Sequence, residues 1–466
     1  MENNTTTGRL DSAPNQLGSA TIGQLLLQYS LPAIIASLAT SLYNIIDSIF
    51  IGRGVGAMAI TGLAITFPLM NLVIAFCVLV AVGGATISSI FLGQRNADKA
   101  SIVVGNVTIL CLLHSIFIMA IGLLFLDQIL YFFGATDETL PYAREFMFII
   151  ILGTPISYVF MGLNNLMRAT GYPKKAMISA LLSVGINIVV APLTIFVFKL
   201  GISGAAIATI SGQFVAFIWV LSHFVSKKSY IHFTRSCWRL SSSLVRKMYS
   251  IGLSPFLMNC CTCLVVVFIN KALLDNAGAD GNLAVGAYGI INRTSTFFVM
   301  IVFGITQGMQ PILGYNFGAA NWPRVKQTLS LGMLLATAVA LVGFTLTEVF
   351  PDTISRLFTT DTGMVAIARD GFRIFFMFFP VVGIQVVIQN YFQSIGKPKL
   401  SIFLSLTRQL IFLLPLLWVL PRYFGVTGVW VSMCLSDFIA FTLALVTVLI
   451  MNRRIAKQLN TANKHD

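Results

Sequence analysis

Long apolar segments separated by short polar ones follow one another along the whole chain. An apolar segment needs about 20 residues to cross the hydrocarbon core of a bilayer as a helix. Several segments exceed 25 residues, which predicts helices that tilt or extend beyond the bilayer. No strand-like alternation competes with this pattern, and only helices and closed barrels span lipid. We therefore predict an all-α polytopic membrane protein with twelve transmembrane helices, at 22–51, 59–92, 101–126, 140–168, 175–198, 201–225, 247–273, 283–315, 325–350, 364–394, 399–420 and 425–452.

The second half of the chain repeats the first at a shift of about 225 residues. Over residues 127–174 the shift brings together 11 identical residues in 48 ungapped positions, and "NLMRATGYPK" falls on "NYFQSIGKPK". A repeat of this size indicates duplicated architecture. Because six helices return the chain to its starting side, we predict two parallel six-helix lobes related by a pseudo-two-fold axis along the membrane normal. Upstream, the matched pairs are Gly83 with Gly308, Gly93 with Gly318, and Asn96 with Asn321.

The repeat also sets the predicted domains. Residues 1–225 form an N-lobe with helices 1–6, and residues 248–466 form a C-lobe with helices 7–12. Between them, 226–247 is a cytoplasmic basic linker and the expected hinge. Two equal bundles that rock about a cavity between them indicate a transporter rather than a channel with a fixed pore.

Composition and charge agree with a membrane location. The chain is 57% hydrophobic and only 10% charged, whereas a soluble domain carries about 25% charged residues. A net charge of +14 could suggest nucleic acid, but 20 of the 30 Lys and Arg fall in segments that share one side of the membrane. The positive-inside rule therefore predicts both termini in the cytoplasm and no nucleic-acid partner. The polar N-terminal segment does not resemble a cleaved signal peptide.

Asp47 stands out among the acids within the predicted helices. It lies in the outer half of helix 1, in "SLYNIIDSIFIGR", with Tyr43 and Asn44 one turn earlier on the same face. A charge inside a bilayer costs about 2.5–3.5 kcal/mol on insertion scales, so such a residue is a functional candidate. We predict that its carboxylate binds and releases a proton or cation during transport. The alternative is an acid close to outside water that pairs with Arg53.

Other polar residues of the predicted spans have either a structural or a functional interpretation. Asn187 in helix 5 and Thr209 in helix 6 could complete a polar pocket around Asp47, or could only join helices by hydrogen bonds. Arg408 and Asp437, in helices 11 and 12, are predicted to pair with each other.

Arg293 lies about ten residues into helix 8. It is either a structural cation or a fixed charge in the cavity of the C-lobe, where it would modulate ion or substrate binding. Most of the 37 Phe and 17 Met are expected to face lipid or pack between helices, and some to form an adaptable wall of the cavity. The residues expected along the substrate cavity are Arg293, Gln307, Gln310, Gln389 and Asn390.

Motifs of ATPases, metalloenzymes and redox proteins are missing from the sequence. There is no G-x-x-x-x-G-K-[ST], no H-E-x-x-H and no pair of C-x-x-C motifs. The cluster Cys260, Cys261 and Cys263 matches no usual zinc spacing, and most of the seven cysteines lie in apolar segments. We therefore predict a protein that is not an enzyme, with no catalytic residue, no metal site and no cofactor.

Taken together, these residues resemble the multidrug and toxic compound extrusion (MATE) family of secondary transporters, above all its prokaryotic branch. The resemblance spans nearly the whole chain. It implies two lobes around a V-shaped cavity in the plasma (bacterial inner) membrane, and export of organic, often cationic, compounds against inward H⁺ or Na⁺. It rests on Pro32, Tyr43, Asn44 and Asp47 in helix 1, and on "GQRNADKA" (93–100), "RATGYPKKAM" (168–177), "GISGAAIAT" (201–209) and "QGMQPILGYNFGAAN" (307–321).

The resemblance also implies a cation site in the N-lobe, and there the chain departs from the family. A second Asp expected one turn after the Asn of helix 5 is replaced by Ala191, in "NIVVAP". One carboxylate cannot form a coupled pair that shares protons. Either Asp47 alone couples transport, or Arg293 or Asp437 substitutes, or coupling is altered. The residues that match the family site are Asp47, Asn187 and Thr209.

We therefore predict a cation-coupled antiporter that exports cationic or amphipathic organic compounds by alternating access, as a monomer surrounded by membrane lipid. The alternative is a flippase for a lipid-linked sugar or related amphiphile, whose cavity would need Arg and Lys for a pyrophosphate; Arg293 and Arg408 are its candidates. A membrane-embedded prenyl transferase would need acid clusters such as D-D-x-x-D, which the sequence lacks.

Overall fold

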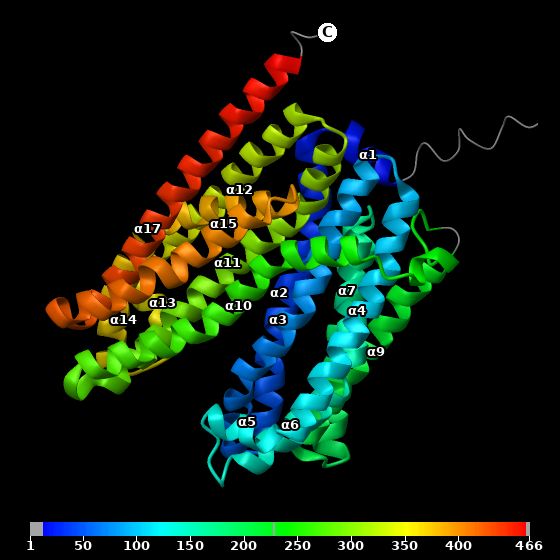
Figure 1. The fold of residues 1–466 in the computed structure, drawn as a ribbon. Coiled ribbons are helices and arrows are strands. Elements are labelled where there is room, and N and C mark those ends of the chain that lie inside the picture. Colours follow the sequence, from blue (N-terminus) through cyan, green and yellow to red (C-terminus); the bar gives the residue numbers. More distant parts are fainter. Residues whose placement is uncertain (1–12, 227–228, 463–466) are drawn as a thin grey trace, which may run out of the picture. The chain divides into compact units, whose positions relative to one another are not determined.

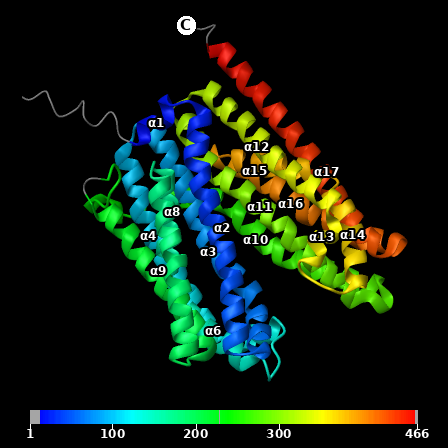
Figure 2. The same cartoon turned by 180° about the vertical axis from the view of Figure 1, so that it is seen from behind.

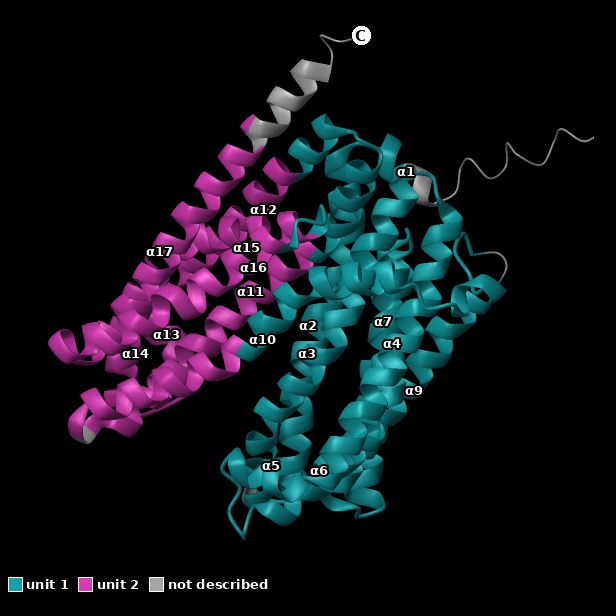
Figure 3. Cartoon of the chain, viewed as in Figure 1, with its two compact units in different colours: residues 1–260, 307–328, 394–398 teal, residues 261–306, 329–393, 399–466 magenta. Residues whose placement is uncertain are grey.

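The computed structural model describes residues 13–226 and 229–462, and every regular element in them is a helix (Figure 1). The helices form two compact units (Figure 3). Unit 1 comprises 1–260, 307–328 and 394–398, and unit 2 comprises 261–306, 329–393 and 399–466. Several long helices thus contribute one end to each unit. The predicted lobe boundaries at 225 and 248 stay a prediction.

The whole first half of the chain belongs to unit 1. Its elements are α1 (Ala13–Ser19), α2 (Ile22–Gly54), α3 (Ala57–Gly93), α4 (Ala97–Leu124), α5 (Leu126–Phe132), α6 (Leu140–Leu152), α7 (Thr154–Ala169), α8 (Pro173–Pro192), the π-helical turn η1 (Leu193–Val197), α9 (Gly201–Val225) and the 3-10 turn η2 (Arg235–Trp238). The second half supplies α10 (Ser242–Asn276), η3 (Gly278–Asp280), α11 (Gly281–Gly318), α12 (Trp322–Val349), α13 (Pro351–Arg356), α14 (Thr362–Phe376), α15 (Phe379–Ser394), α16 (Pro398–Leu406), the π-helical η4 (Thr407–Leu413) and α17 (Leu414–Ala462).

The helices of the described part account for twelve membrane spans. Nine helical stretches are long and apolar enough to cross, and two bent pairs pass together: α6 with α7, and α14 with α15. One stretch, Pro398–Met451, has 54 residues. It would measure about 80 Å, although the hydrocarbon core is about 30 Å thick. Its backbone leaves the helical conformation at Gly425, so it holds two spans. The predicted all-α, twelve-helix membrane protein is confirmed.

The repeat appears in the local structure of each unit. The α6–α7 pair bends by 55° and the matched α14–α15 pair by 52°. In both pairs a proline, Pro155 or Pro380, opens the second helix, where its missing N–H leaves no intrahelical bond unmade. Gly201 and Gly425, which begin the sixth and twelfth spans, share the left-handed backbone conformation at φ 57° and 56°.

Inside unit 1, α3 and α11 cross at two glycines that the repeat matches. A β-carbon at Gly93 would lie 1.9 Å from the carbonyl oxygen of Tyr315, and one at Gly318 would lie 2.1 Å from that of Ile90. Ile90 and Tyr315 are also 225 residues apart. Each helix therefore presents the same two positions to the other. Only glycine allows two backbones to approach so closely.

Candidate functional site

A polar cluster in unit 1 joins three helices through one hydroxyl group. Thr209 Oγ1 on α9 donates to the Ala205 carbonyl at 3.1 Å and accepts from Asn187 Nδ2 on α8 at 3.1 Å. Tyr43 Oη on α2 lies 3.2 Å from the same Thr209 oxygen. Because the Thr209 proton is already used, Tyr43 is the donor in that contact. Asn187 and Thr209 thus join two helices by a hydrogen bond. Their part in a polar pocket around Asp47 stays a prediction.

Local sequence explains why these helices come together. The helices α2, α8 and α9 pack against one another in unit 1 (Figure 2). Alanines such as Ala205, Ala206 and Ala208 are fully buried on α9 next to Thr209. Small side chains let helices approach closely in a membrane, so that a hydroxyl or an amide can reach its neighbour.

Asp47 lies one helical turn beyond Tyr43 on α2, and only 7% of the residue is exposed. Its Oδ1 is buried and has no hydrogen-bond partner among the described residues. A buried carboxylate without partners is unfavourable in its charged state. A proton or small cation on that oxygen would remove this cost. The alternative pairing with Arg53 is not formed, since Arg53 is exposed and takes part in no ion pair with a described residue.

Two neighbours of this cluster contribute no polar atom to it. The methyl group of Ala191, one turn after Asn187 on α8, is fully buried. The Asn44 side chain is exposed, and its backbone carbonyl accepts a hydrogen bond from Ser48 Oγ at 2.8 Å. We refer to Tyr43, Asp47, Asn187 and Thr209 as the Thr209 cluster. A coupling role for these residues and for Asn44 stays a prediction.

The structure divides the residues expected along the substrate cavity between the two units. In unit 1, Gln310 Nε2 donates to Thr86 Oγ1 at 2.9 Å, and Gln307 Oε1 accepts from Arg168 Nη1 at 2.6 Å. Both glutamines therefore join α11 to other helices. In unit 2, Gln389 Nε2 donates to Ser405 Oγ at 2.5 Å, Asn390 is half-buried and Arg293 is exposed. Their place in a cavity stays a prediction.

The predicted pair of Arg408 and Asp437 is present in unit 2. Arg408 Nε lies 2.6 Å from Asp437 Oδ1, and Asp437 is buried. Arg408 belongs to the π-helical segment η4, which carries it beside α17. In contrast to Asp47, this acid is neutralised by a partner, so it is not free to bind a cation.

Sequence reasoning missed two further polar contacts of unit 1. Arg168 at the end of α7 donates to Asn165 Oδ1 at 2.6 Å as well as to Gln307, so its acceptors are amides. His114 on α4 bonds Tyr249 Oη on α10 at 2.7 Å. The signal for Arg168 was its place in a repeated motif in which the second copy carries Gln393. In the described part of the chain, no three His, Cys, Asp or Glu side chains gather into a metal-binding group.

A protein-family model and several multidrug export proteins match most of the chain. The family model MatE matches residues 32–193 and 251–419. The chain is 29% identical over 436 residues to the multidrug export protein MepA of Staphylococcus haemolyticus (strain JCSC1435), covering 94% of this chain and 95% of that protein. It is 25% identical over 430 residues to MepA of Staphylococcus aureus (strain NCTC 8325 / PS 47), covering 92% and 94%.

Solved structures have the same fold. A crystal structure of MATE in the bent conformation superposes with a TM-score of 0.89 at 22% identity, over 97% of this chain and 99% of that one. A MOP superfamily transporter from Pyrococcus furiosus Vc1 (DSM3638), for which a reverse polarity of the binding pocket suggests a different function, gives a TM-score of 0.88 at 21% identity, over 94% and 97%. At these identities the likeness shows the fold alone.

Proposed function

The chain belongs to the MatE family of multidrug and toxic compound extrusion transporters, and we propose that it exports structurally diverse organic compounds as a cation-coupled antiporter. As a member of this family it is a multi-pass membrane transporter and not an enzyme. The relatives named multidrug export proteins, which match it over nearly its whole length, support multidrug efflux as its activity.

The unpartnered oxygen of Asp47 is the observation that carries the coupling proposal. Of the two acids that are buried within spans in the described part, Asp437 is held by Arg408, whereas Asp47 Oδ1 is buried without a hydrogen bond. A proton or Na⁺ that arrives from outside occupies Asp47 and biases the protein toward one side of the alternating-access cycle. The Thr209 hydroxyl and the Asn187 amide fix the helices that frame this carboxylate.

The substrates that we propose are amphipathic compounds, including organic cations. Because Ala191 has no acidic side chain, the Thr209 cluster holds only one carboxylate. A second anion that would attract a cationic substrate is therefore missing from this cluster. Apolar contact would then contribute more to substrate affinity than charge does. A compound series with matched hydrophobicity and different charge measures this balance directly.

The coupling role of Asp47 is tested by replacing it with Asn in an efflux-deficient host and measuring ethidium efflux. We expect a loss of at least tenfold in the initial rate, because the amide cannot take up a proton or balance a cation. Asp275→Asn, the same change at an exposed position of α10, is the matched control and should retain wild-type efflux. Wild-type efflux by Asp47→Asn at equal expression would overturn the proposal.

The coupling ion is identified in proteoliposomes that contain the purified full-length protein. Ethidium uptake is followed under a pH gradient alone and under a Na⁺ gradient alone. The gradient that drives uptake in the wild-type protein should fail to do so in Asp47→Asn. Uptake that needs neither gradient would exclude an antiporter.

A further inference from the structure

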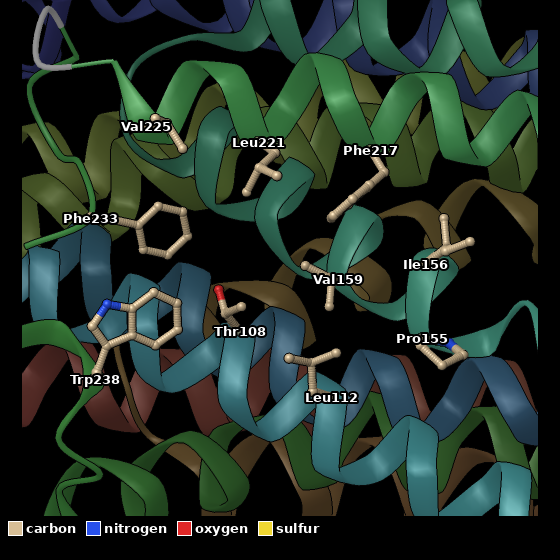
Figure 4. A pocket seen from close by; sticks show the side chains of 10 residues that line it. All are labelled: Thr108, Leu112, Pro155, Ile156, Val159, Phe217, Leu221, Val225, Phe233 and Trp238. Carbon is tan, nitrogen blue, oxygen red and sulfur yellow. The ribbon is translucent and has the colours of Figure 1, made fainter.

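An apolar groove of about 400 Å³ opens in unit 1 among α4, α7, α9 and the segment that follows α9 (Figure 4). On α9 it is lined by Phe217, Leu221 and Val225, which are spaced four residues apart and so share one face. Along these residues the groove extends for about 12 Å. Its volume falls in the range of ordinary ligand pockets, about 300–1,000 Å³.

The walls of the groove offer almost no polar atoms. Opposite α9, the lining comes from Leu112 and Thr108 on α4 and from Val159 on α7. The Thr108 hydroxyl is already used, since it donates to the Val104 carbonyl of its own helix at 2.9 Å. A ligand in this groove therefore gains apolar contact and no hydrogen bond, which suits a hydrocarbon chain.

Two aromatic rings close one end of the groove. Phe233 and Trp238 stack with ring centroids 5.3 Å apart and planes 6° from parallel. Figure 4 shows both rings at the same end, with Pro155 and Ile156 at the other. Tryptophan is enriched where hydrocarbon meets headgroups, because its ring is apolar and its N–H is polar. The ring end of the groove therefore suits the level of the lipid headgroups.

The segment that carries these rings is fixed to the helices beneath it. Asn106 on α4 is fully buried, and its Nδ2 donates to the Arg239 carbonyl at 3.0 Å. Its Oδ1 accepts from the Ser241 N–H at 3.1 Å. A backbone bond of 2.9 Å from the Phe233 N–H to the Phe224 carbonyl ties the segment to α9. This part of the basic linker is a docked element of unit 1.

Two basic residues are close in sequence to the aromatic end. Arg239 follows Trp238 directly, Arg235 lies three residues before it, and both are exposed. Neither takes part in an ion pair with a described residue. Residues 229–247 carry four Lys or Arg and no Asp or Glu. An anion, and not a cation, complements this end of the groove.

We propose that the groove binds an anionic phospholipid, with one acyl chain along Phe217, Leu221 and Val225 and its phosphate at Arg235 and Arg239. Neighbouring side chains such as Leu113 and Ile218 are exposed and apolar, so the groove lies on a face that contacts lipid. The linker is predicted to lie on the cytoplasmic side, the leaflet in which anionic lipids attract Lys and Arg. An organic cation would meet repulsion at the two arginines. None of the lining residues belongs to the Thr209 cluster, so this site is independent of the proposed coupling.

The proposal is tested by quenching of Trp238 fluorescence in vesicles that contain lipids with brominated acyl chains. The chain has five tryptophans, so the Trp238 signal is taken as the difference between the wild type and Trp238→Phe. We expect half-maximal quenching by brominated phosphatidylglycerol at a mole fraction at least about fivefold lower than by brominated phosphatidylcholine, since a basic residue near the surface favours anionic lipid by about that factor. Equal quenching by the two lipids would overturn the proposal.

Three variants locate the two parts of the lipid. Arg235→Gln with Arg239→Gln should bring the two quenching curves together, whereas Lys397→Gln with Lys399→Gln, which removes as much charge from another exposed segment, should leave them apart. Val159→Phe fills the groove and should lower quenching by both lipids; Leu221→Phe serves if that variant does not fold. Quenching that persists in the filled, folded variant, or displacement of the lipid by ethidium, would overturn the acyl-chain site.

Discussion

Among the described residues, each of the two units holds one buried acid on a repeated scaffold, but the acids differ in what surrounds them. In unit 1, Asp47 Oδ1 has no partner among the described residues, and in unit 2, Asp437 is held at 2.6 Å by Arg408. The repeat gives neither acid an acidic counterpart. Counted from Pro32 and Pro255, the prolines inside α2 and α10, the position that matches Asp47 is Asn270. Counted from the paired Gly201 and Gly425, the position that matches Asp437 is Gln213.

This difference separates two uses of charge in a membrane. A paired acid can join helices and remain ionised through a transport cycle, because its partner travels with it. A buried acid without a partner is stable only when a proton or a bound cation from solution neutralises it. One copy of the fold can therefore hold a permanent ion pair, and the other a carboxylate that exchanges its proton or cation.

The same substitution should have opposite consequences for stability in the two units. Asp437→Asn leaves the Arg408 guanidinium without its anion and should lower the free energy of unfolding by about 3–5 kcal/mol. Asp47→Asn removes a buried charge that lacks a partner, so it should leave stability unchanged or raise it. Thermal unfolding of the purified variants in one detergent measures both. Equal losses in the two variants would remove the distinction.

A double substitution controls for packing at the paired site. Arg408→Leu together with Asp437→Leu replaces both partners by apolar groups, and such replacements of buried pairs are often neutral. We expect the double variant to be more stable than Asp437→Asn. A double variant that is as unstable as the single one would mean that side-chain shape, and not charge pairing, holds η4 against α17.

A smaller effect is expected at the hydroxyl that joins α2, α8 and α9. Thr209→Ala leaves the Asn187 amide and the Tyr43 hydroxyl without their acceptor and should cost about 0.6–1.7 kcal/mol, the range for hydrogen bonds between membrane helices. Thr209→Ser should restore most of the loss. The control is Thr345→Ala in unit 2, where an exposed hydroxyl bonds only the Leu341 carbonyl of its own helix. Thermal unfolding measures these losses. An equal loss of stability in Thr209→Ala and Thr345→Ala would contradict the prediction.

The smallest effect concerns an ion pair that occurs at matched positions within each unit. Arg144 lies 2.8 Å from Asp127, and Arg369 lies 3.7 Å from Asp352, with 42–61% of each of the four side chains exposed. Asp127→Asn and Asp352→Asn should each cost less than about 1 kcal/mol. The unit 1 variant should lose slightly more, and high salt should abolish the difference. A loss in Asp352→Asn that exceeds the loss in Asp127→Asn would show that distance does not govern this pair.

The sequence predicted the features that depend on local pattern. The long apolar segments predicted the membrane spans, because a bilayer requires a minimum length of apolar helix. The internal repeat predicted which positions of the two halves are equivalent, such as Gly93 and Gly318. The pairing of Arg408 with Asp437 was predicted because charged groups in a membrane need partners and few were present. For Asn187 and Thr209 the sequence left open whether they join helices or complete a pocket.

Features that depend on the approach of distant segments were not predictable. The amide acceptors of Arg168 come from its own helix and from α11, and no local signal joins Arg168 to Gln307. The docking of the linker depends on Asn106, which in the sequence is one polar residue within an apolar helix. The π-helical segments η1 and η4 carry no sequence signature that we can identify, although η4 sets the position of Arg408.

The crossing of α3 and α11 has a consequence for how such a chain arose. At Gly93 and Gly318 each helix offers the other the same two positions, and this reciprocity is what an isologous contact means in a symmetric homodimer. A six-helix ancestor that paired in parallel through this glycine would already have made both halves of the contact. Fusion of two gene copies would have preserved it without any new surface. Asp47 and Asp437 would then be differences that arose between the two copies after the fusion.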